Sequence, residues 1–384
     1  MNGVYTAPRY VFYGSDALKE AIPVITSLGK KALIVTGKSM IRQGYMKELT
    51  DMLTEKGVES VVFDRIPGEP TDTMIDEGLA IYKSEGCDFL IGFGGGSPLD
   101  SAKAIGVLVT NGGNIADYNG RVIEKELPPV VAIPTTAGTG SEATQFTIIS
   151  DTKTDIKMLL KGKVVLPLVA VIEPRFTLQT PKSVTSASGL DALTHAVEAY
   201  TSKKANDFTD MYAIDAVKRI FGFLPTAYND GTNYEAREQM AIAAYEAGLC
   251  INNASVTIVH GMSRPIGALF HVPHGLSNAM LLTECLSFAA EGAPARFASL
   301  ARAVGKASET DTDETAAKKL IEAMKALCEV CEVPTLEEYG VDRKAFMASV
   351  NKMTKDALDS GSPANTLRDV TFDDVVRIYH NLWK

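Results

Sequence analysis

The strongest constraint on the fold is a change of pattern near residue 178. Before it, the short apolar runs KALIVTG, VVFDRI, CDFLIGF and PVVAIP each lead into a helical stretch or a glycine-rich loop. Strands that alternate with helices form a parallel sheet covered on both faces. After it, only helical periodicity is present, in the segments 183–201, 206–223, 233–251, 274–306, 312–332, 343–356 and 372–383. The sequence therefore predicts two domains: an N-terminal α/β Rossmann-like parallel sheet at 1–178 and an all-helical domain at 179–384.

Composition excludes several classes of protein. The net charge of -9 argues against a broad basic surface for nucleic acid. No apolar segment approaches the length that spans a bilayer, and the N-terminus lacks the basic and apolar regions of a signal peptide. Five scattered cysteines indicate free thiols in a reducing compartment. We therefore expect a cytoplasmic protein that binds neither nucleic acid nor membrane.

One C-x-x-C pair, Cys328 and Cys331, is present near the expected end of a helix that Pro334 closes. A thioredoxin-like redox motif requires a strand before the helix, and no strand precedes this one. We therefore expect neither a redox nor a metal-binding role for this pair.

Four of the five histidines fall between His195 and His274. Asp191 and His195 are four residues apart in a helical stretch, so their side chains share one face. His260 and His274 each directly precede a glycine. A single histidine is more often a core or surface residue, but a carboxylate with three imidazoles is a ligand set for iron or zinc. The sequence predicts a divalent metal site in the helical domain, facing the cleft between the domains.

A glycine-rich loop follows the third of these strands. The chain reads GGGSPLDSAKA, with Ser97 expected at the N-cap, Pro98 at the first helical position and Asp100 at the third. Glycines allow close backbone approach, and a helix N-terminus attracts a phosphate. The motif differs from the usual G-x-G-x-x-G fingerprint and does not follow the first strand, so a tight turn without a ligand is the alternative.

A second loop of the same kind, TTAGTGSEAT, follows the next strand. Two loops at the carboxyl ends of neighbouring strands suit a ligand with two phosphates, such as a dinucleotide. Taken alone, the second loop would be a weak signal.

Together, GGGSPLDSAKA, PTTAGTGSE, SGLDALTHAVEAY and VHGMSRPIGALFHVPHG resemble the iron-containing (group III) alcohol dehydrogenases. That family includes lactaldehyde reductase and the bacterial propanediol, butanol and methanol dehydrogenases. The resemblance covers essentially the whole chain. It implies hydride transfer between a nicotinamide and small primary alcohols or aldehydes, a divalent metal acting as Lewis acid, and a homodimer or larger assembly.

The resemblance also implies roles for individual residues. The metal ligands would be Asp191, His195, His260 and His274. The residues that would bind the cofactor are Gly94, Gly95, Gly96, Ser97 and Asp100 in the first loop, and Thr135, Thr136, Thr139 and Ser141 in the second. Lys157, in an expected hairpin at 146–160, is similar to a family lysine near the nicotinamide ribose. Lys103 is expected near the cofactor, with a solvated helix lysine as the alternative.

Two positions depart from the family pattern. Many relatives carry a histidine four residues after the third metal ligand, where this chain has Arg264, a poor general base. His271 is then the candidate proton relay, with a supporting or exposed histidine as the alternative. After the strand KALIVT, relatives that prefer NAD place an aspartate where this chain has Gly37, Lys38 and Ser39. Because Lys38 can pair with a 2′-phosphate, we expect NADP(H) to be favoured over NAD(H).

Three other functions are compatible with parts of the sequence. Arg264 could indicate a small anionic aldehyde as substrate. A cyclase similar to dehydroquinate synthase would share the fold but needs more basic residues than Arg264 alone. A non-catalytic nucleotide-binding protein would have no use for the metal ligands. The donor set accepts Fe2+, Zn2+ and other divalent metals, so it does not identify the metal.

Overall fold

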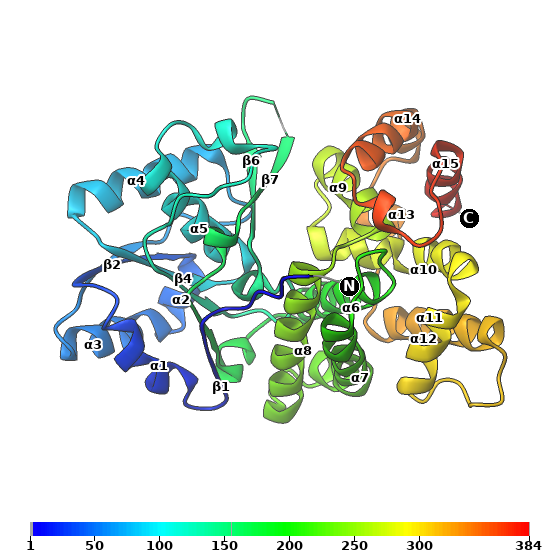
Figure 1. Ribbon diagram of the computed structural model, residues 1–384, viewed down its shortest axis with the longest axis horizontal. Helices are drawn as coiled ribbons and strands as arrows, with labels where there is room; N and C mark the ends of the chain where they lie inside the picture. Colours follow the sequence, from blue (N-terminus) through cyan, green and yellow to red (C-terminus); the bar gives the residue numbers. More distant parts are fainter. Residues whose placement is uncertain (1–2, 155, 384) are drawn as a thin grey trace. The chain divides into compact units, whose positions relative to one another are not determined.

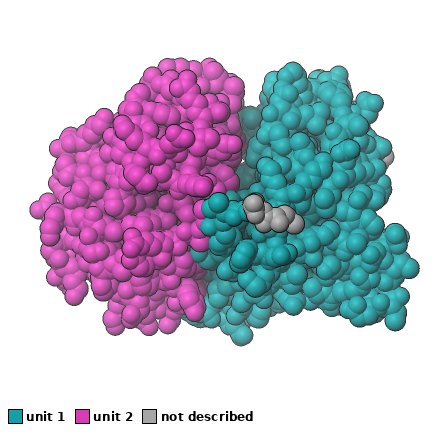
Figure 2. All heavy atoms as spheres, viewed as in Figure 1, with its two compact units in different colours: residues 1–5, 181–384 teal, residues 6–180 magenta. Residues whose placement is uncertain are grey.

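The computed structural model describes residues 3–154 and 156–383. These residues form two compact units (Figure 2). The N-terminal unit comprises residues 6–180, and the helical unit comprises residues 3–5 and 181–383. Residues 3–5 join the helical unit, where the ring of Tyr5 lies 5.6 Å from that of Phe208 and 6.3 Å from that of Tyr212. The domain ranges expected from the sequence, 1–178 and 179–384, place residues 3–5 in the N-terminal domain instead. Residues 1, 2, 155 and 384 lie outside the described part.

The N-terminal unit is built on a parallel sheet, as the sequence predicted. Its six strands lie in the order β1-β8-β5-β4-β2-β3, and every pairing between them is parallel. The strands are β1 (Tyr10–Tyr13), β2 (Lys31–Thr36), β3 (Glu59–Phe63), β4 (Phe89–Gly94), β5 (Val130–Pro134) and β8 (Val169–Ile172). The connecting helices are α1 (Ala17–Ile25), α2 (Lys38–Arg42), α3 (Tyr45–Glu55), α4 (Asp72–Glu85) and α5 (Gly96–Asn111).

Helices lie on both sides of the sheet (Figure 1), and the side chains of both faces are buried. Along β2, Ala32 and Ile34 belong to one core with residues of α1 and α3, whereas Leu33 and Val35 belong to the other with residues of α4 and α5. Successive strand residues point to opposite faces, so a strand covered on both sides is apolar throughout. This is why KALIVT and FLIGFG show continuous apolar runs instead of alternation.

The expected hairpin is also present, outside the main sheet. Strands β6 (Phe146–Asp151) and β7 (Ile156–Lys161) pair antiparallel, with Phe146 opposite Lys161. The inward side chains Ile149, Met158 and Leu160 join the core on the α5 face of the sheet. The hairpin therefore packs on the sheet, although it does not extend it.

The helical unit contains the remaining helices: α6 (Lys182–Tyr200), α7 (Asp207–Asn229), α8 (Tyr234–Asn253), α9 (Ile258–Phe270), α10 (His274–Gly292), α11 (Pro294–Ala303), α12 (Asp313–Val330), α13 (Leu336–Tyr339), α14 (Arg343–Asp359) and α15 (Phe372–Asn381). Helix α9 was not expected from the sequence, because Pro265 and two glycines lower its intrinsic helix propensity. Helices α10 and α11 were expected as one helix, and the structure separates them at Ala293 and Pro294.

Within the described residues, no single helix is long and apolar enough to cross a membrane, and the one pair that would qualify by length and composition, α8 with α9, is bent by 102°. All five cysteines are free. Cys328 and Cys331 lie at the end of α12, and burial raises the pKa of both thiols to about 12. A raised thiol pKa disfavours the reactive thiolate.

Candidate metal and cofactor sites

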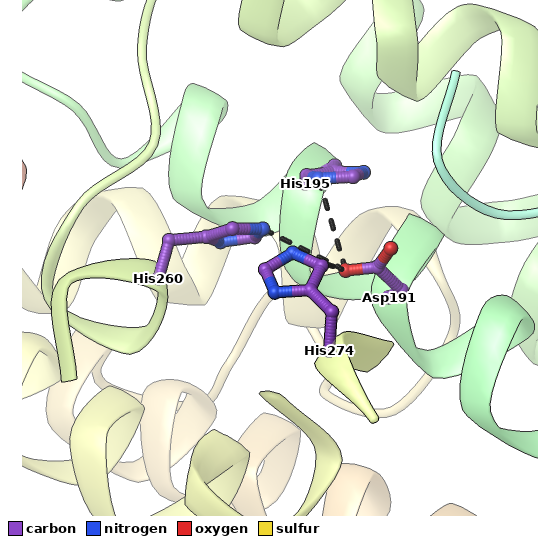
Figure 3. Close-up of side chains that lie close together, drawn as sticks. All are labelled: Asp191, His195, His260 and His274. Carbon is purple, nitrogen blue, oxygen red and sulfur yellow. Dashed lines mark ion pairs between the residues drawn. The ribbon is translucent and has the colours of Figure 1, made fainter. Parts of the chain in front are cut away.

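Three helices of the helical unit bring Asp191, His195, His260 and His274 together (Figure 3). Asp191 and His195 lie one turn apart on α6, His260 lies near the start of α9, and His274 is the first residue of α10. A side chain at Gly275 would meet the backbone oxygen of Ala187 at 2.5 Å. The glycine after His274 therefore allows α10 to begin directly against α6.

The geometry of the cluster centres on one carboxylate oxygen. Asp191 Oδ1 lies 3.7 Å from His195 Nε2, 3.6 Å from His260 Nε2 and 3.8 Å from His274 Nε2. The rings of His195 and His260 stack with centroids 4.6 Å apart. All four ligand atoms lie within 4.8 Å of one another, and every residue except His274 is buried.

The electrostatics of the cluster favour a charged carboxylate. Burial acts to raise the pKa of Asp191, but the neighbouring imidazoles outweigh it and lower that pKa below its usual range. Burial acts to lower the pKa of His260, but Glu198 and Asp191 outweigh it and raise that pKa. A buried anion with imidazole nitrogens directed at it is the environment that a divalent cation stabilises.

These residues fit a metal ion. Two ligands bound to one cation at about 2.1 Å and tetrahedral angles lie about 3.4 Å apart, which is close to the separations from Asp191 Oδ1. One carboxylate oxygen and three imidazole nitrogens suit iron, zinc and similar divalent metals. The chemistry and the spacing of the donors therefore agree.

Two residues of this site were missed by the sequence analysis. Glu198, on α6, lies 2.5 Å from His260 Nδ1 through Oε2. The side-chain amide of Asn278 donates to Asp191 Oδ1 at 2.7 Å and lies 3.1 Å from His260 Nε2. Glu198 could have been found, because it follows Asp191 by seven residues and therefore shares its helical face. Asn278 follows His274 by four residues and shares the face of His274 in the same way.

A pocket of about 190 Å³ lies in the N-terminal unit at the carboxyl ends of β2, β3 and β4. It is lined by Gly37, Ser39, Ile66, Pro67, Gly68 and the loop Gly94–Pro98. The chain leaves β2 toward β3 and leaves β4 toward β5, so the pocket lies at the switch point of the sheet. Ligands of open α/β sheets bind at such points.

The two expected phosphate loops lie against each other beside this pocket. A side chain at Gly96 would meet Thr139 Cγ2 at 2.8 Å, and one at Gly95 would lie 3.5 Å from Thr136 Cγ2. The backbone of Thr135 donates to Gly94 O at 2.8 Å. Only glycine at position 96 permits this close approach of the loops.

The first loop differs from expectation where the helix starts. Helix α5 begins at Gly96 with Gly95 at the N-cap, two residues before the position expected from Ser97 and Pro98. The carboxylate of Asp100 accepts from Ser141 Oγ at 2.6 Å and from the backbone of Ile148 at 2.9 Å. Asp100 and Ser141, both expected to bind the cofactor, therefore bond to each other.

The structure excludes one of the two alternatives expected for Lys103. Its side chain is fully buried, so the solvated helix lysine is wrong. The ammonium donates to Ser141 O at 2.5 Å, Thr144 O at 2.9 Å and Phe146 O at 2.8 Å. Burial lowers the pKa of Lys103 to about 8, and burial raises the pKa of nearby Glu142 to about 7. Lys103 therefore fixes the backbone of the second loop through the hydrogen bonds of its ammonium.

Two other lysines expected near the cofactor also belong to the N-terminal unit. Lys157, on β7, is partly buried and pairs with Glu69 at 2.6 Å. Lys38 is the first residue of α2 and is exposed, next to pocket-lining Gly37 and Ser39.

The two residues singled out for proton transfer or substrate binding lie on α9 and at its end. The guanidinium of Arg264 donates to Ser362 Oγ at 3.0 Å and is partly buried, which lowers its pKa. His271 is the C-cap of α9 with a φ of 54°, and its side chain is exposed. It therefore belongs to the turn that leads from α9 into His274.

A pocket at the switch point of a parallel sheet and a cluster of one carboxylate and three imidazoles define a class of protein that can hold a dinucleotide and a divalent metal. Comparison with known proteins agrees with that class. The family profile described as iron-containing alcohol dehydrogenase matches residues 8–174, and the profile for the C-terminal part of the Fe-containing alcohol dehydrogenase family matches residues 185–383. The chain belongs to the iron-containing alcohol dehydrogenase family.

Individual relatives span nearly the whole chain. The NAD-dependent methanol dehydrogenase of Bacillus methanolicus is 35% identical over 99% of this chain and 100% of its own. The 1,3-propanediol dehydrogenase of Citrobacter freundii is 37% identical over 94% of each chain. A crystal structure of 1,3-propanediol oxidoreductase superposes with a TM-score of 0.95, at 35% identity and full coverage of both chains.

These findings confirm the fold class and the reaction class. The protein is an alcohol/aldehyde oxidoreductase of the iron-containing family. They do not favour the alternatives of a cyclase or a reductase dedicated to anionic aldehydes. A non-catalytic nucleotide-binding protein is likewise not favoured, since these relatives are named dehydrogenases.

Proposed function

We propose that this protein interconverts small primary alcohols and aldehydes by hydride transfer with a nicotinamide cofactor, using a divalent metal held by Asp191, His195, His260 and His274. The convergence of these four donors within 4.8 Å of one another carries the proposal. A divalent cation held by these residues would supply Lewis acidity toward the substrate oxygen.

The chain's own residues orient the reactants. Gly95, Gly96 and Ser97 offer backbone amides at the start of α5 to the pyrophosphate. Thr136 and Thr139 border the same loop and contact the cofactor in this proposal. Lys157 is proposed to lie at the nicotinamide ribose by its likeness to the family lysine.

The proton is proposed to leave through His271. This histidine is exposed and lies three residues before His274, so it can exchange a proton with solvent. Arg264 is proposed to shape the site, because a guanidinium that stays protonated cannot serve as a base.

We further propose that the cofactor is NADP(H) in preference to NAD(H). No carboxylate follows β2 at Gly37, and exposed Lys38 lies directly beside the pocket. Arg65 bridges to Gly37 through its backbone, and its guanidinium, 65% exposed, pairs with Glu77 at 3.3 Å. Two cations next to this end of the pocket support binding of a 2′-phosphate. The ratio of kcat/KM for NADPH to that for NADH tests this preference, and a ratio below one would contradict it.

A homodimer or larger assembly and a cytoplasmic location complete the proposal, both by analogy with the family. Light scattering coupled to gel filtration tests the assembly, and a monomer would contradict it.

The reaction itself is tested with metal-free protein reconstituted anaerobically with Fe2+ or Zn2+. We expect consumption of NADPH with a panel of small aldehydes in at least one metal-loaded sample and none in the metal-free sample. Equal rates without metal would refute the proposed mechanism.

A further inference from the structure

Glu198 places a carboxylate in the interior of the helical unit, next to the candidate metal ligands. Its side chain is 0% exposed. Oε1 accepts from Thr257 Oγ1 at 2.7 Å and from the backbone N–H of Val259 at 2.6 Å, and Oε2 lies 2.5 Å from His260 Nδ1. Among the ion pairs of the described residues, His260 is the partner of Glu198, and no lysine or arginine pairs with it.

This arrangement defines the state of the His260 ring. An ionised carboxylate only accepts hydrogen bonds, so Nδ1 must carry the hydrogen that lies between the two groups. The opposite nitrogen, Nε2, lies 3.6 Å from Asp191 Oδ1, within the cluster. A neutral imidazole protonated at Nδ1 presents its lone pair at Nε2, the form that binds a metal.

The same carboxylate also holds the N-terminus of α9. Thr257 is the N-cap of α9 but makes no capping bond with its own side chain, and its hydroxyl donates to Glu198 instead. The backbone N–H of Val259, in the first turn, is satisfied by Glu198 as well. A negative charge at this end of a helix is favourable, because the free N–H groups and the helix dipole are positive there.

We propose that Glu198 is a positioning residue for the metal site: it fixes the tautomer and orientation of His260 and joins the start of α9 to α6, which carries Asp191 and His195. The inference rests on the proposed metal site. Burying the Glu198 carboxylate without a lysine or arginine as partner is costly. The three hydrogen bonds that it accepts from Thr257, Val259 and His260 offset that cost.

The substitution Glu198→Gln tests the inference with little change in shape. The glutamine oxygen still accepts from Thr257 and Val259, but its amide donates toward Nδ1. His260 then protonates at Nε2 and loses the lone pair directed at the metal. We expect Zn2+ to bind about 10- to 100-fold more weakly, the range typical of lost supporting hydrogen bonds at metal sites.

The measurement is Zn2+ affinity of the full chain by competition with a chromogenic chelator. Glu246→Gln is the matched control, since Glu246 is a buried glutamate of the same unit that pairs with Arg219 and not with a histidine. The visible spectrum of the Co2+-loaded proteins gives a second signal, which should change in Glu198→Gln and not in Glu246→Gln. Circular dichroism checks that both variants fold.

The Zn2+ affinities and the Co2+ spectra separate failure of the role proposed for Glu198 from failure of the proposed metal site. If wild-type protein binds Zn2+ tightly and Glu198→Gln binds it within threefold, with an unchanged Co2+ spectrum, Glu198 does not position His260. If wild-type protein binds no Zn2+, the proposed metal site is wrong and the inference fails with it. Equal weakening in Glu246→Gln would assign the effect to general destabilisation and overturn the inference.

Discussion

We expect Glu142 to make the stability of the N-terminal unit depend on pH. Its side chain is 2% exposed and lies in the second glycine-rich loop, and its Oε2 atom is buried without a hydrogen-bond partner among the described residues. Burial raises the pKa of Glu142 from 4.5 to about 7, against the smaller opposing effects of its own backbone and of Lys103. The substitution Glu142→Gln keeps the shape and removes the titration.

The sign follows from the raised pKa. Between about pH 4.5 and pH 7 the folded state holds a proton that the unfolded state has lost, so the contribution to stability falls as pH rises. It is fully present below pH 4.5 and lost above pH 7. Each unit of pKa difference between the folded and unfolded states is worth about 1.4 kcal/mol, and the pKa of Glu142 rises from 4.5 to about 7. The free energy of unfolding of the wild-type protein should therefore fall by on the order of 3 kcal/mol relative to Glu142→Gln across this pH range.

Urea unfolding at pH 4.5, 6 and 8 measures this difference. Far-UV circular dichroism follows both units, and the single tryptophan, Trp383, reports the helical unit separately. We expect the free energy of unfolding of the variant to rise relative to wild type by about 3 kcal/mol from pH 4.5 to pH 8, without a matching change in the Trp383 signal. A constant difference between the two proteins at all three pH values would refute the reasoning.

Three further predictions concern the two sites. His260→Ala should lose bound metal and turnover together, as measured by metal analysis and an NADPH assay; full activity would show that the ligand set is misassigned. Lys103→Met should lower the free energy of unfolding by about 3–5 kcal/mol, because buried carbonyls and Asp100 lose their cation; a loss below about 1 kcal/mol would contradict this. Gly96→Ala should weaken NADPH binding about tenfold, or about 1.4 kcal/mol, since its side chain would meet Thr139 at 2.8 Å; unchanged binding by fluorescence titration would place the cofactor elsewhere.

Much of the fold could be predicted from local sequence patterns. The continuous apolar run at β2 indicated a strand covered on both faces, and the helical spacing of Asp191 and His195 placed them on one face. Helix α9 could not be predicted in this way, because Pro265 and two glycines disfavour a helix and packing against α10 and α14 overrides that preference. Tertiary contacts, which a local pattern does not contain, determined this element.

The candidate metal and cofactor sites were likewise predictable only in part from the sequence. That His260 and His274 join Asp191 was predicted from the concentration of histidines in one stretch of the chain and from the family resemblance. No spacing rule joins residues on three helices, so local pattern alone could not give the geometry. Glu198 shares a helical face with Asp191, and its hydrogen bonds to α9 emerge only in the folded chain. The sequence left two alternatives for Lys103, near the cofactor or solvated on the helix, because burial of its ammonium depends on carbonyls from a segment about forty residues later.

The most direct test of the central claim is an anomalous diffraction map of crystals of the Zn2+-loaded protein. The account predicts one strong peak about 2.1 Å from Asp191 Oδ1 and from Nε2 of His195, His260 and His274. A peak bound by other residues, or no peak at this cluster in metal-loaded crystals, would contradict it.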